Sequence, residues 1–444
     1  MSMTTTITIR ARFVIAAALA AALAAPSGGV WAQAAARVLP DPAVLELAAG
    51  PAEPDAGALL RAGLLFSGAT PARTERAAAA ARALMEEAAA MAAAEPDAWR
   101  LGEALLGLLH DRWLKRYVEA ETTLDAAILD GRYNCVSASV AYLVLAKAAG
   151  LEAGGVITRD HAFCYVTAGG VAVDVETTNR HGWDPGTKKE FLDSFGRVTG
   201  YSYVPPSDYR NRDSVGGRHV AALILWNRST LLERASRWAE ALALSADAYA
   251  WLGTDEARRH LAERAHNYAA LFINTRRWDE ALELFGRLES AYGELGDIPL
   301  LARQAAVGRL ADRLPGLESA EALAGIAEAM DSGLLSEEDR RSMYGYVLSR
   351  QAAAVAASDG WLAAWRLLQG ASDAEPDFGE LAKLAANARA NYVAETHNRF
   401  AALYNARRFA EALAIMQEAL LVLPGDRTFL KDAELAGKAI AQGG

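Results

Sequence analysis

The segment 131–178 most constrains how this chain can fold, because an Asn-capped apolar helix pattern is followed by two alternating strand patterns. Asn134 is a good helix N-cap, apolar side chains recur at helical spacing over residues 135–149, and Gly150 is placed to end the helix. Nearly every position of this helix is apolar or small. The sequence therefore predicts a helix that begins at Cys135 and is buried on most of its sides.

Two short runs after this helix alternate in the manner of strands. His161 opens the first run, Glu176 ends the second, and Gly169 and Gly170 lie between them, which predicts a β-hairpin that turns at the glycines. With an even number of loop residues, His161, Asp174 and Glu176 share one side of the hairpin, whereas an odd number separates them. Either acid could orient the imidazole, and strand pairing alone does not choose between them.

Cys135 is placed to act as a nucleophile. The unpaired N–H groups and the positive dipole end of a helix start favour a thiolate over a thiol. The same N–H groups could stabilise an oxyanion on an attacked carbonyl. Thiol, imidazole and carboxylate follow one another along the segment, and together they are the components of a Cys-His-Asp acyl-transfer site.

Three short motifs carry a family resemblance. Residues 133–137 read Tyr-Asn-Cys-Val-Ser, residues 160–163 read Asp-His-Ala-Phe, and residues 174–178 read Asp-Val-Glu-Thr-Thr. In this order the motifs resemble the transglutaminase-like superfamily, whose site is similar to that of papain-type cysteine peptidases. The resemblance covers roughly residues 101–206, about a quarter of the chain.

The resemblance implies an α+β, papain-like domain with three catalytic residues. Matched by position, Cys135 is the nucleophile, His161 the general base and then acid, and Asp174 the carboxylate that orients the imidazole. Many members of the superfamily have Pro after the acid, whereas Val175 follows it here. This difference leaves Glu176 as an alternative third member.

Two other interpretations of these residues stay open. In an exported protein, a disulfide between Cys135 and Cys164 is the main structural alternative. Strand alternation argues against it, because Cys164 lies three residues after His161 and therefore on the opposite face. His181 is a second imidazole, but it lies in a Gly-rich turn with no fixed direction towards the thiol.

The first 32 residues have the pattern of a secretory signal. Arg10 and Arg12 precede a short apolar run over residues 13–25, and a small residue, Ala32, is suited to cleavage after it. The apolar run is too short to span a bilayer comfortably. We therefore expect an exported protein, periplasmic or secreted, with no permanent membrane span.

Charge and composition disfavour several classes of partner. The formal net charge is −10, and no basic run with interleaved aromatic residues is present, so nucleic-acid binding is not expected. The seven histidines are scattered, neither cysteine belongs to a Cys-x-x-Cys pair, and no Gly-rich phosphate loop occurs. The sequence therefore predicts neither a metal nor a cofactor.

Outside the central segment the chain reads as helical. After the signal peptide at 1–32, a helical N-terminal region is expected over 33–98, the transglutaminase-like domain over 99–210, and long helices over 219–444. The expected fold is thus predominantly helical, with an α+β domain followed by an all-α region.

One phrase occurs three times in the C-terminal region. An aromatic residue at Trp238, Trp278 or Phe409 follows an arginine and precedes Glu-Ala-Leu, and Trp361 begins a degenerate fourth copy. The phrase resembles the tetratricopeptide repeat, whose stacked helix pairs form a solenoid that commonly binds a protein or peptide. The first two copies are 40 residues apart, which is longer than the usual repeat.

Two functions follow as hypotheses. The first is an exported cysteine acyl-transfer enzyme, a peptidase, an amidase or a protein cross-linking enzyme, that acts on a protein or peptide and binds a protein partner through its repeats. The alternative is a transglutaminase-like module that has lost catalysis and serves as an interaction scaffold in the cell envelope.

Overall fold

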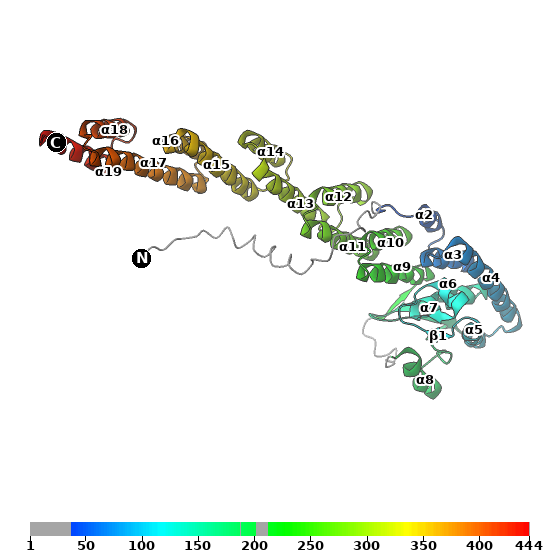
Figure 1. The fold of residues 1–444 in the computed structure, drawn as a ribbon. Coiled ribbons are helices and arrows are strands. Elements are labelled where there is room, and N and C mark those ends of the chain that lie inside the picture. Colours follow the sequence, from blue (N-terminus) through cyan, green and yellow to red (C-terminus); the bar gives the residue numbers. More distant parts are fainter. Residues whose placement is uncertain (1–36, 187, 201–211, 444) are drawn as a thin grey trace. The chain divides into compact units, whose positions relative to one another are not determined.

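The computed structural model describes residues 37–186, 188–200 and 212–443, so the predicted signal segment 1–32 lies outside the described residues (Figure 1). The described residues are predominantly helical and include a small sheet, as the sequence predicts at this coarse level. They divide into two compact units, Met1–Ala302 and Arg303–Gly444, and the division falls within helix α13 (Ile298–Arg313). Among the described helices, none is both long and apolar enough to cross a membrane.

The first unit contains helices on both sides of the central segment and every strand of the described residues. Its helices are α2 (Pro42–Ala48), α3 (Ala56–Ser67), α4 (Pro71–Ala94), α5 (Ala98–Arg112), α6 (Leu124–Asp130), α7 (Cys135–Ala148), α8 (Lys189–Thr199), α9 (Gly217–Arg234), α10 (Trp238–Leu252), α11 (Asp255–Asn274) and α12 (Trp278–Tyr292). Its strands are β1 (Arg116–Tyr117), β2 (Arg132–Tyr133), β3 (Ala153–Ile157), β4 (Ala162–Ala168), β5 (Val171–Val175) and β6 (Asp213–Val215).

Helix α7 forms as predicted and lies at the centre of the first unit. Asn134 caps it, and Ser137 completes a capping box, because each side chain bonds the backbone of the other residue. The helix packs against helices α3, α4, α5, α6 and α9 and against strand β4. Its buried apolar residues belong to a single large core cluster, so the helix is fixed in place along its whole length.

The four-stranded antiparallel sheet has the strand order β5-β4-β3-β6, and β1 and β2 form a separate parallel pair. The β4–β5 hairpin turns at Gly169 and Gly170, whose φ angles are 60° and 82°. A two-residue hairpin loop of this kind needs positive φ at both positions, which glycine adopts readily. The loop is therefore even, and Tyr165 pairs with Asp174 across the hairpin.

Two strands of this sheet have no clear sequence signal. Strand β3 contains Gly154 and Gly155, and glycine is depleted in strands because it offers no side chain to pack. It pairs with β4 on one side and with the three-residue β6 on the other. Both strands therefore depend on tertiary pairing and not on local propensity.

The first unit crosses the domain boundaries that the sequence suggested. Leu59 of α3 and Leu84 of α4 share one core cluster with Val140 of α7, Leu225 of α9 and Trp251 of α10. These residues come from the expected regions 33–98, 99–210 and 219–444. The compact units instead meet at residues 302 and 303, because the N-terminal helices and the first two helices of the C-terminal region pack on the same core.

The three copies of the repeated phrase adopt the same turn. The residue before each arginine has positive φ, with values of 60° at Ser236, 57° at Arg276 and 59° at Arg407. The arginine that follows then pairs with a glutamate three residues later in every copy. At the fourth copy Gly360 has φ of 83° and ψ of 168°, a different turn, so only three copies share this geometry.

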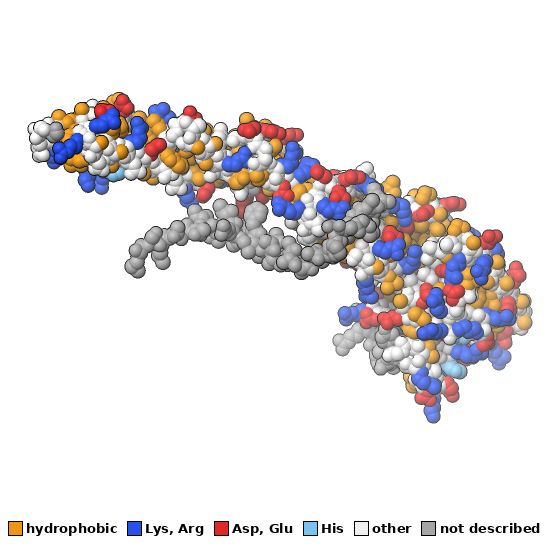
Figure 2. Space-filling view, viewed as in Figure 1, with side chains coloured by type: hydrophobic (Ala, Val, Ile, Leu, Met, Phe, Trp, Pro, Cys, Tyr) orange, Lys and Arg blue, Asp and Glu red, His pale blue; other side chains and the backbone are white. Residues whose placement is uncertain are grey.

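The second unit consists of helices packed on their chain neighbours. They are η3 (Leu314–Gly316), a 3₁₀ turn, and α14 (Ser319–Asp331), α15 (Glu337–Asp359), α16 (Trp361–Ala374), α17 (Gly379–Asn405), α18 (Phe409–Val422) and α19 (Arg427–Ala441). Their buried side chains form several small clusters. Side chains of both charges are interspersed over the visible face of each unit (Figure 2).

Candidate cysteine active site

Cys135 is the first residue of α7 and is half-buried. The Asn134 carboxamide oxygen accepts hydrogen bonds from the backbone amides of Val136 at 2.9 Å and Ser137 at 3.1 Å. These two amides are therefore already satisfied, contrary to the expectation that the whole first turn is open to an oxyanion. The amide of Cys135 has no acceptor among the described residues, so it is the first-turn donor that stays available.

The entry to α7 is tied to the segment that follows β1. The Asn134 side chain donates to the Glu119 carbonyl at 3.0 Å, and the Ser137 hydroxyl donates to the Glu121 carbonyl at 3.0 Å. The backbone amide of Asn134 in turn donates to the Ser137 hydroxyl. These bonds, one buried and two partly buried, fix the backbone that carries the Cys135 side chain.

His161 lies immediately before β4, with its ring held between two acid–base groups. Its Nε2 atom lies 2.6 Å from Oε2 of Glu176, and the two side chains are 18% and 4% exposed. The Cys135 thiol lies near the ring and acts to raise the pKa of His161. Because Nε2 faces Glu176, Nδ1 is the ring nitrogen left for the thiol. Phe163 and Phe195 flank the ring.

The charges of His161 and Glu176 stabilise one another. Burial acts to lower the pKa of His161, but the charge of Glu176 and the nearby Cys135 side chain outweigh it and raise that pKa well above its usual value. Burial acts to raise the pKa of Glu176, yet the charge and hydrogen bond of His161 lower it overall. The pair is therefore an imidazolium and a carboxylate at neutral pH, and the imidazolium can stabilise a thiolate at Cys135.

Glu176 is held by the residues that follow it. Its Oε1 atom accepts hydrogen bonds from the Thr178 backbone amide at 3.1 Å and from the Thr178 hydroxyl at 2.6 Å. Tyr133, next to the helix cap, donates its hydroxyl to the Thr178 carbonyl at 3.0 Å. The carboxylate thus has a fixed orientation, which is what an orienting group for an imidazole requires.

His110 supports the same segment from α5. Its Nε2 atom lies 3.1 Å from the Thr177 carbonyl oxygen, and the Thr177 hydroxyl lies 3.0 Å from that of Ser139 on α7. Burial lowers the pKa of His110 to about 4, so the ring is neutral at pH 7 and donates Nε2–H to the carbonyl. Sequence reasoning assigned no role to Thr177, Thr178 or His110, because their contacts come from elements distant in the chain.

The structure does not bring Asp174 to His161. Asp174 pairs with Tyr165, four residues beyond His161 and so about 13 Å along the strand. Its carboxylate accepts hydrogen bonds from Arg212, one of them at 2.9 Å. The assignment of Asp174 as the orienting acid is therefore not what the geometry provides, and Glu176, the alternative that the sequence left open, holds that position.

Both cysteines are free thiols. Cys164 is buried, and its sulfur lies 3.5 Å from the Ser139 carbonyl oxygen on α7. The two cysteines thus form no disulfide, as strand alternation favoured. The premise that Cys164 points away from the helix does not hold, because its sulfur faces Ser139 of α7, while His161 lies just before β4. Burial is the largest influence on the pKa of Cys164 and raises it, so this thiol is not activated. His181 donates its backbone amide to Asn179 and forms no hydrogen bond with Cys135.

Within the described residues, no group of three or more His, Cys, Asp or Glu side chains is arranged to hold a metal ion. No protein-family model matches the chain, and neither a curated protein nor a solved structure shows significant similarity to it. The chemistry of the site is therefore argued from its own geometry.

Proposed function

We propose that this chain is a cysteine acyl-transfer enzyme of the transglutaminase-like type, with Cys135 as nucleophile, His161 as acid and base, and Glu176 as the orienting carboxylate. The observation that carries the proposal is the position of the His161 ring, which bonds a buried carboxylate and lies near the thiol at the start of α7. Activated cysteine nucleophiles use this arrangement of thiol, imidazole and third group.

The reaction begins when the Cys135 thiolate attacks the carbonyl carbon of an amide and the backbone amide of Cys135 donates to the oxyanion. The C–N bond then breaks as the His161 imidazolium gives its proton to the leaving amine. This step leaves a thioester on Cys135 and a neutral imidazole. Glu176 holds the ring by Nε2, which leaves Nδ1 to exchange the proton with the reacting groups.

The thioester is resolved by a second nucleophile. Neutral His161 removes a proton from water or from a primary amine as that group attacks the thioester carbon, and the C–S bond breaks to regenerate the thiolate–imidazolium pair. Water gives a carboxylic acid and makes the enzyme a peptidase or amidase, whereas an amine gives a new amide and makes it a cross-linking enzyme. The amide attacked is a peptide bond or a glutamine side chain of a protein or peptide.

The first test is the rate of alkylation of Cys135 by iodoacetamide between pH 5 and 9, read by mass spectrometry of the purified chain. We expect fast alkylation at pH 6, a loss of at least about tenfold in His161→Ala, and a smaller loss in Glu176→Gln. Asp174→Asn is the matched control, since it removes a carboxylate from the same strand that does not contact His161, and it should react like the wild type.

Two results would contradict the proposal. If Cys135 is alkylated equally fast in the wild type and in His161→Ala, Cys135 is a structural residue. The alternative hypothesis of an inactive interaction scaffold would then be favoured. A loss in Asp174→Asn that matches the loss in Glu176→Gln would remove the distinction between the two acids. Buried Cys164 serves as an internal control in every sample, because it should stay unmodified in folded protein.

We further propose that the repeated helices bind a protein partner. The shared turn at the three copies supports a common repeat architecture, and the last two helices expose Leu421 at 85%, Leu430 at 49% and Ile440 at 44%. Cross-linking mass spectrometry in cell-envelope extract, with wild type and Leu421→Ser, tests this proposal. A cross-linked partner that disappears in the variant supports it, and an identical cross-link pattern in both counts against this face.

We also propose that the chain is exported, on the basis of its first 32 residues. N-terminal sequencing of the protein recovered from cell fractions should find a new terminus after Ala32 in the periplasm or the medium. Recovery of the intact terminus from the cytosol alone would contradict export.

A further inference from the structure

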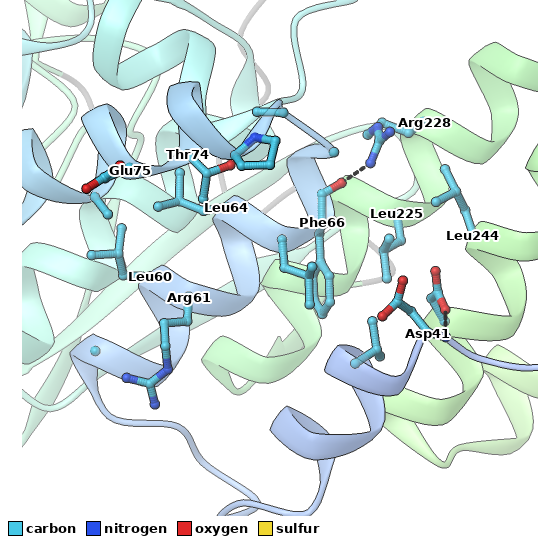
Figure 3. A pocket seen from close by; sticks show the side chains of 18 of the residues that line it. Asp41, Leu60, Arg61, Leu64, Phe66, Thr74, Glu75, Leu225, Arg228 and Leu244 are labelled. Carbon is cyan, nitrogen blue, oxygen red and sulfur yellow. Dashed lines mark hydrogen bonds between the residues drawn. The ribbon is translucent and has the colours of Figure 1, made fainter.

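A cavity lies in the first unit, formed by residues outside the cysteine site. Its volume is about 900 Å³, and its lining comes from α2, α3, α4, α9 and α10. Leu60 and Leu64 of α3, Leu225 of α9 and Leu244 of α10 are among its apolar lining (Figure 3). A volume of this size is within the range of roughly 300–1,000 Å³ that small-molecule sites occupy. The apolar lining favours a ligand with an apolar body.

Arg228 of α9 introduces a positive charge into this lining. Its Nη1 atom donates to the Phe66 carbonyl at the end of α3, and its guanidinium group lies against Gly68. Figure 3 shows this contact at one side of the cavity and Arg61 at the opposite side of the view. A guanidinium group has five N–H donors, so the bond to Phe66 uses only part of its capacity.

No carboxylate of the described residues forms a hydrogen bond or ion pair with Arg228. Burial lowers the pKa of Arg228 overall, because the distant charges of Asp125 and Asp247 do not offset the desolvation. Largely buried cations are normally paired. Arg228 is therefore a cation at an apolar cavity without an anionic partner from the chain.

The other charges of the lining do not supply that partner. Asp247 is neutralised by Arg37, which donates two hydrogen bonds to it at 2.8 Å and 2.6 Å, and it also accepts the backbone amide of Asp41. Four arginines line the cavity, against three acidic residues. The cavity therefore has an excess of positive charge that an anionic ligand would complement.

We propose that this cavity binds an amphiphilic monocarboxylate with a straight alkyl chain, whose carboxylate pairs with Arg228 and whose chain lies among the leucines of α3, α9 and α10. Arginine and carboxylate form strong, charge-assisted bonds of defined geometry. The site is separate from Cys135, His161 and Glu176, so the inference does not depend on the proposed catalytic function.

The test is isothermal titration calorimetry of the purified full chain with sodium decanoate, and with 1-decanol as a neutral ligand of equal chain length. We expect decanoate to bind at one site and decanol to bind at least about tenfold more weakly. Arg228→Gln should weaken decanoate binding by a similar factor. Arg76→Gln, an exposed arginine of α4 outside the lining, is the charge-matched control and should bind like the wild type.

A second pair of variants keeps the test decisive if Arg228→Gln does not fold. Ala78→Phe fills the cavity from α4 without a change in charge, and Ala79→Phe places the same ring at the exposed neighbouring position. We expect Ala78→Phe to abolish decanoate binding and Ala79→Phe to leave the affinity within about twofold of the wild type. Circular dichroism melts show which variants are folded.

Three outcomes would overturn the proposal. The first is no binding of decanoate by the wild type. The second is equal affinity for decanoate and decanol, which would show that Arg228 does not select an anion. The third is an equal loss in Ala78→Phe and Ala79→Phe, which would place the binding outside this cavity. Alkylation of Cys135 in the same variants should be unchanged, so that failure here is distinguishable from failure of the catalytic proposal.

Discussion

Helix α7 of the first unit and the helices of the second unit bury their side chains in different ways. Every residue from Val136 to Ala146 is buried in α7, and the apolar ones belong to one large cluster that also includes residues of α3, α4, α5, α9 and α10. In the second unit, α16 buries only Ala364 and Leu368. A helix enclosed on all sides can hold a nucleophile at a fixed position, whereas a helix with one buried stripe packs only on its neighbours.

The clusters of the second unit are correspondingly local. One cluster involves α13 to α15, a second α15 to α17, and a third the helices from α16 to the chain's end. In a chain of this kind, stability is close to a sum of contributions from neighbouring elements. Damage should therefore spread through the first unit but stay near its origin in the second.

The largest expected effect comes from matched core deletions. Leu143→Ala in α7 should destabilise the first unit by about 4 kcal/mol, and Ile326→Ala in α14 should cost about 3 kcal/mol, because both side chains are almost fully buried. Hydrogen exchange should rise throughout the first unit in Leu143→Ala but only around α14 and α15 in Ile326→Ala. Equal spread of exchange in the two variants would break the comparison.

The next effect is an acid-dependent loss of stability in the first unit. Because the pKa of His110 is about 4 in the folded state and 6.5 in its usual state, the unfolded chain binds the extra proton between these values. Stability is full above pH 6.5 and falls by about 3 kcal/mol as the pH drops to 4. Urea unfolding at pH 7 and 4.5 measures this loss, which should be clearly smaller in His110→Gln. An unchanged loss would exclude His110 as its source.

A third prediction has the opposite sign and concerns His161. Its pKa is raised on folding, so its contribution is full below its unfolded pKa of 6.5 and is lost as the pH rises through the folded value. Glu176→Gln should cost about 2 kcal/mol at pH 6 and less at pH 10, because the imidazolium loses its carboxylate partner. Chemical unfolding at both pH values checks this, with Asp174→Asn beside it. A cost independent of pH would contradict the charged pair.

The smallest effect sharpens the comparison at the repeated turn. Ser236 in the first unit and Arg407 in the second have positive φ, which costs a non-glycine residue strain. Ser236→Gly and Arg407→Gly should each stabilise their own unit by about 0.5–1 kcal/mol. Ala235→Gly, at φ −86°, is the control and should destabilise. Thermal melts measure the change in stability of each variant. A loss of stability in both Ser236→Gly and Arg407→Gly would contradict the shared turn geometry.

The parts of the fold that the sequence predicts are those set by near neighbours in the chain. Asn134 and Ser137 lie within one helical turn, so the helix cap follows from local sequence. Gly169 and Gly170 are the two residues of the hairpin loop, so the hairpin also follows from local sequence. Strands β3 and β6 escape prediction, because their residues gain strand conformation only by pairing with other strands. The boundary between the two compact units, after residue 302, likewise depends on contacts between residues distant in sequence.

The candidate site shows the same division. Cys135 and His161 are identified by their places at a helix start and a strand start, since both places are local properties. Local sequence does not identify the carboxylate that bonds His161, because Asp174 and Glu176 are both acids and lie two residues apart, on the same face of the strand. Glu176 is held beside His161 by Thr178, whose carbonyl accepts the Tyr133 hydroxyl, whereas Asp174 bonds Arg212.

The sequence by itself determined that a thiol begins a buried helix, that an imidazole precedes a hairpin, and that helices dominate the rest. Only the tertiary structure decided which acid bonds His161, which first-turn amides are already used, and that the N-terminal helices share a core with α7, α9 and α10. The physical reason is the distance along the chain over which each interaction acts. Capping and turn energies act within a few residues, whereas an ion pair or a packed core depends on groups that folding alone brings together.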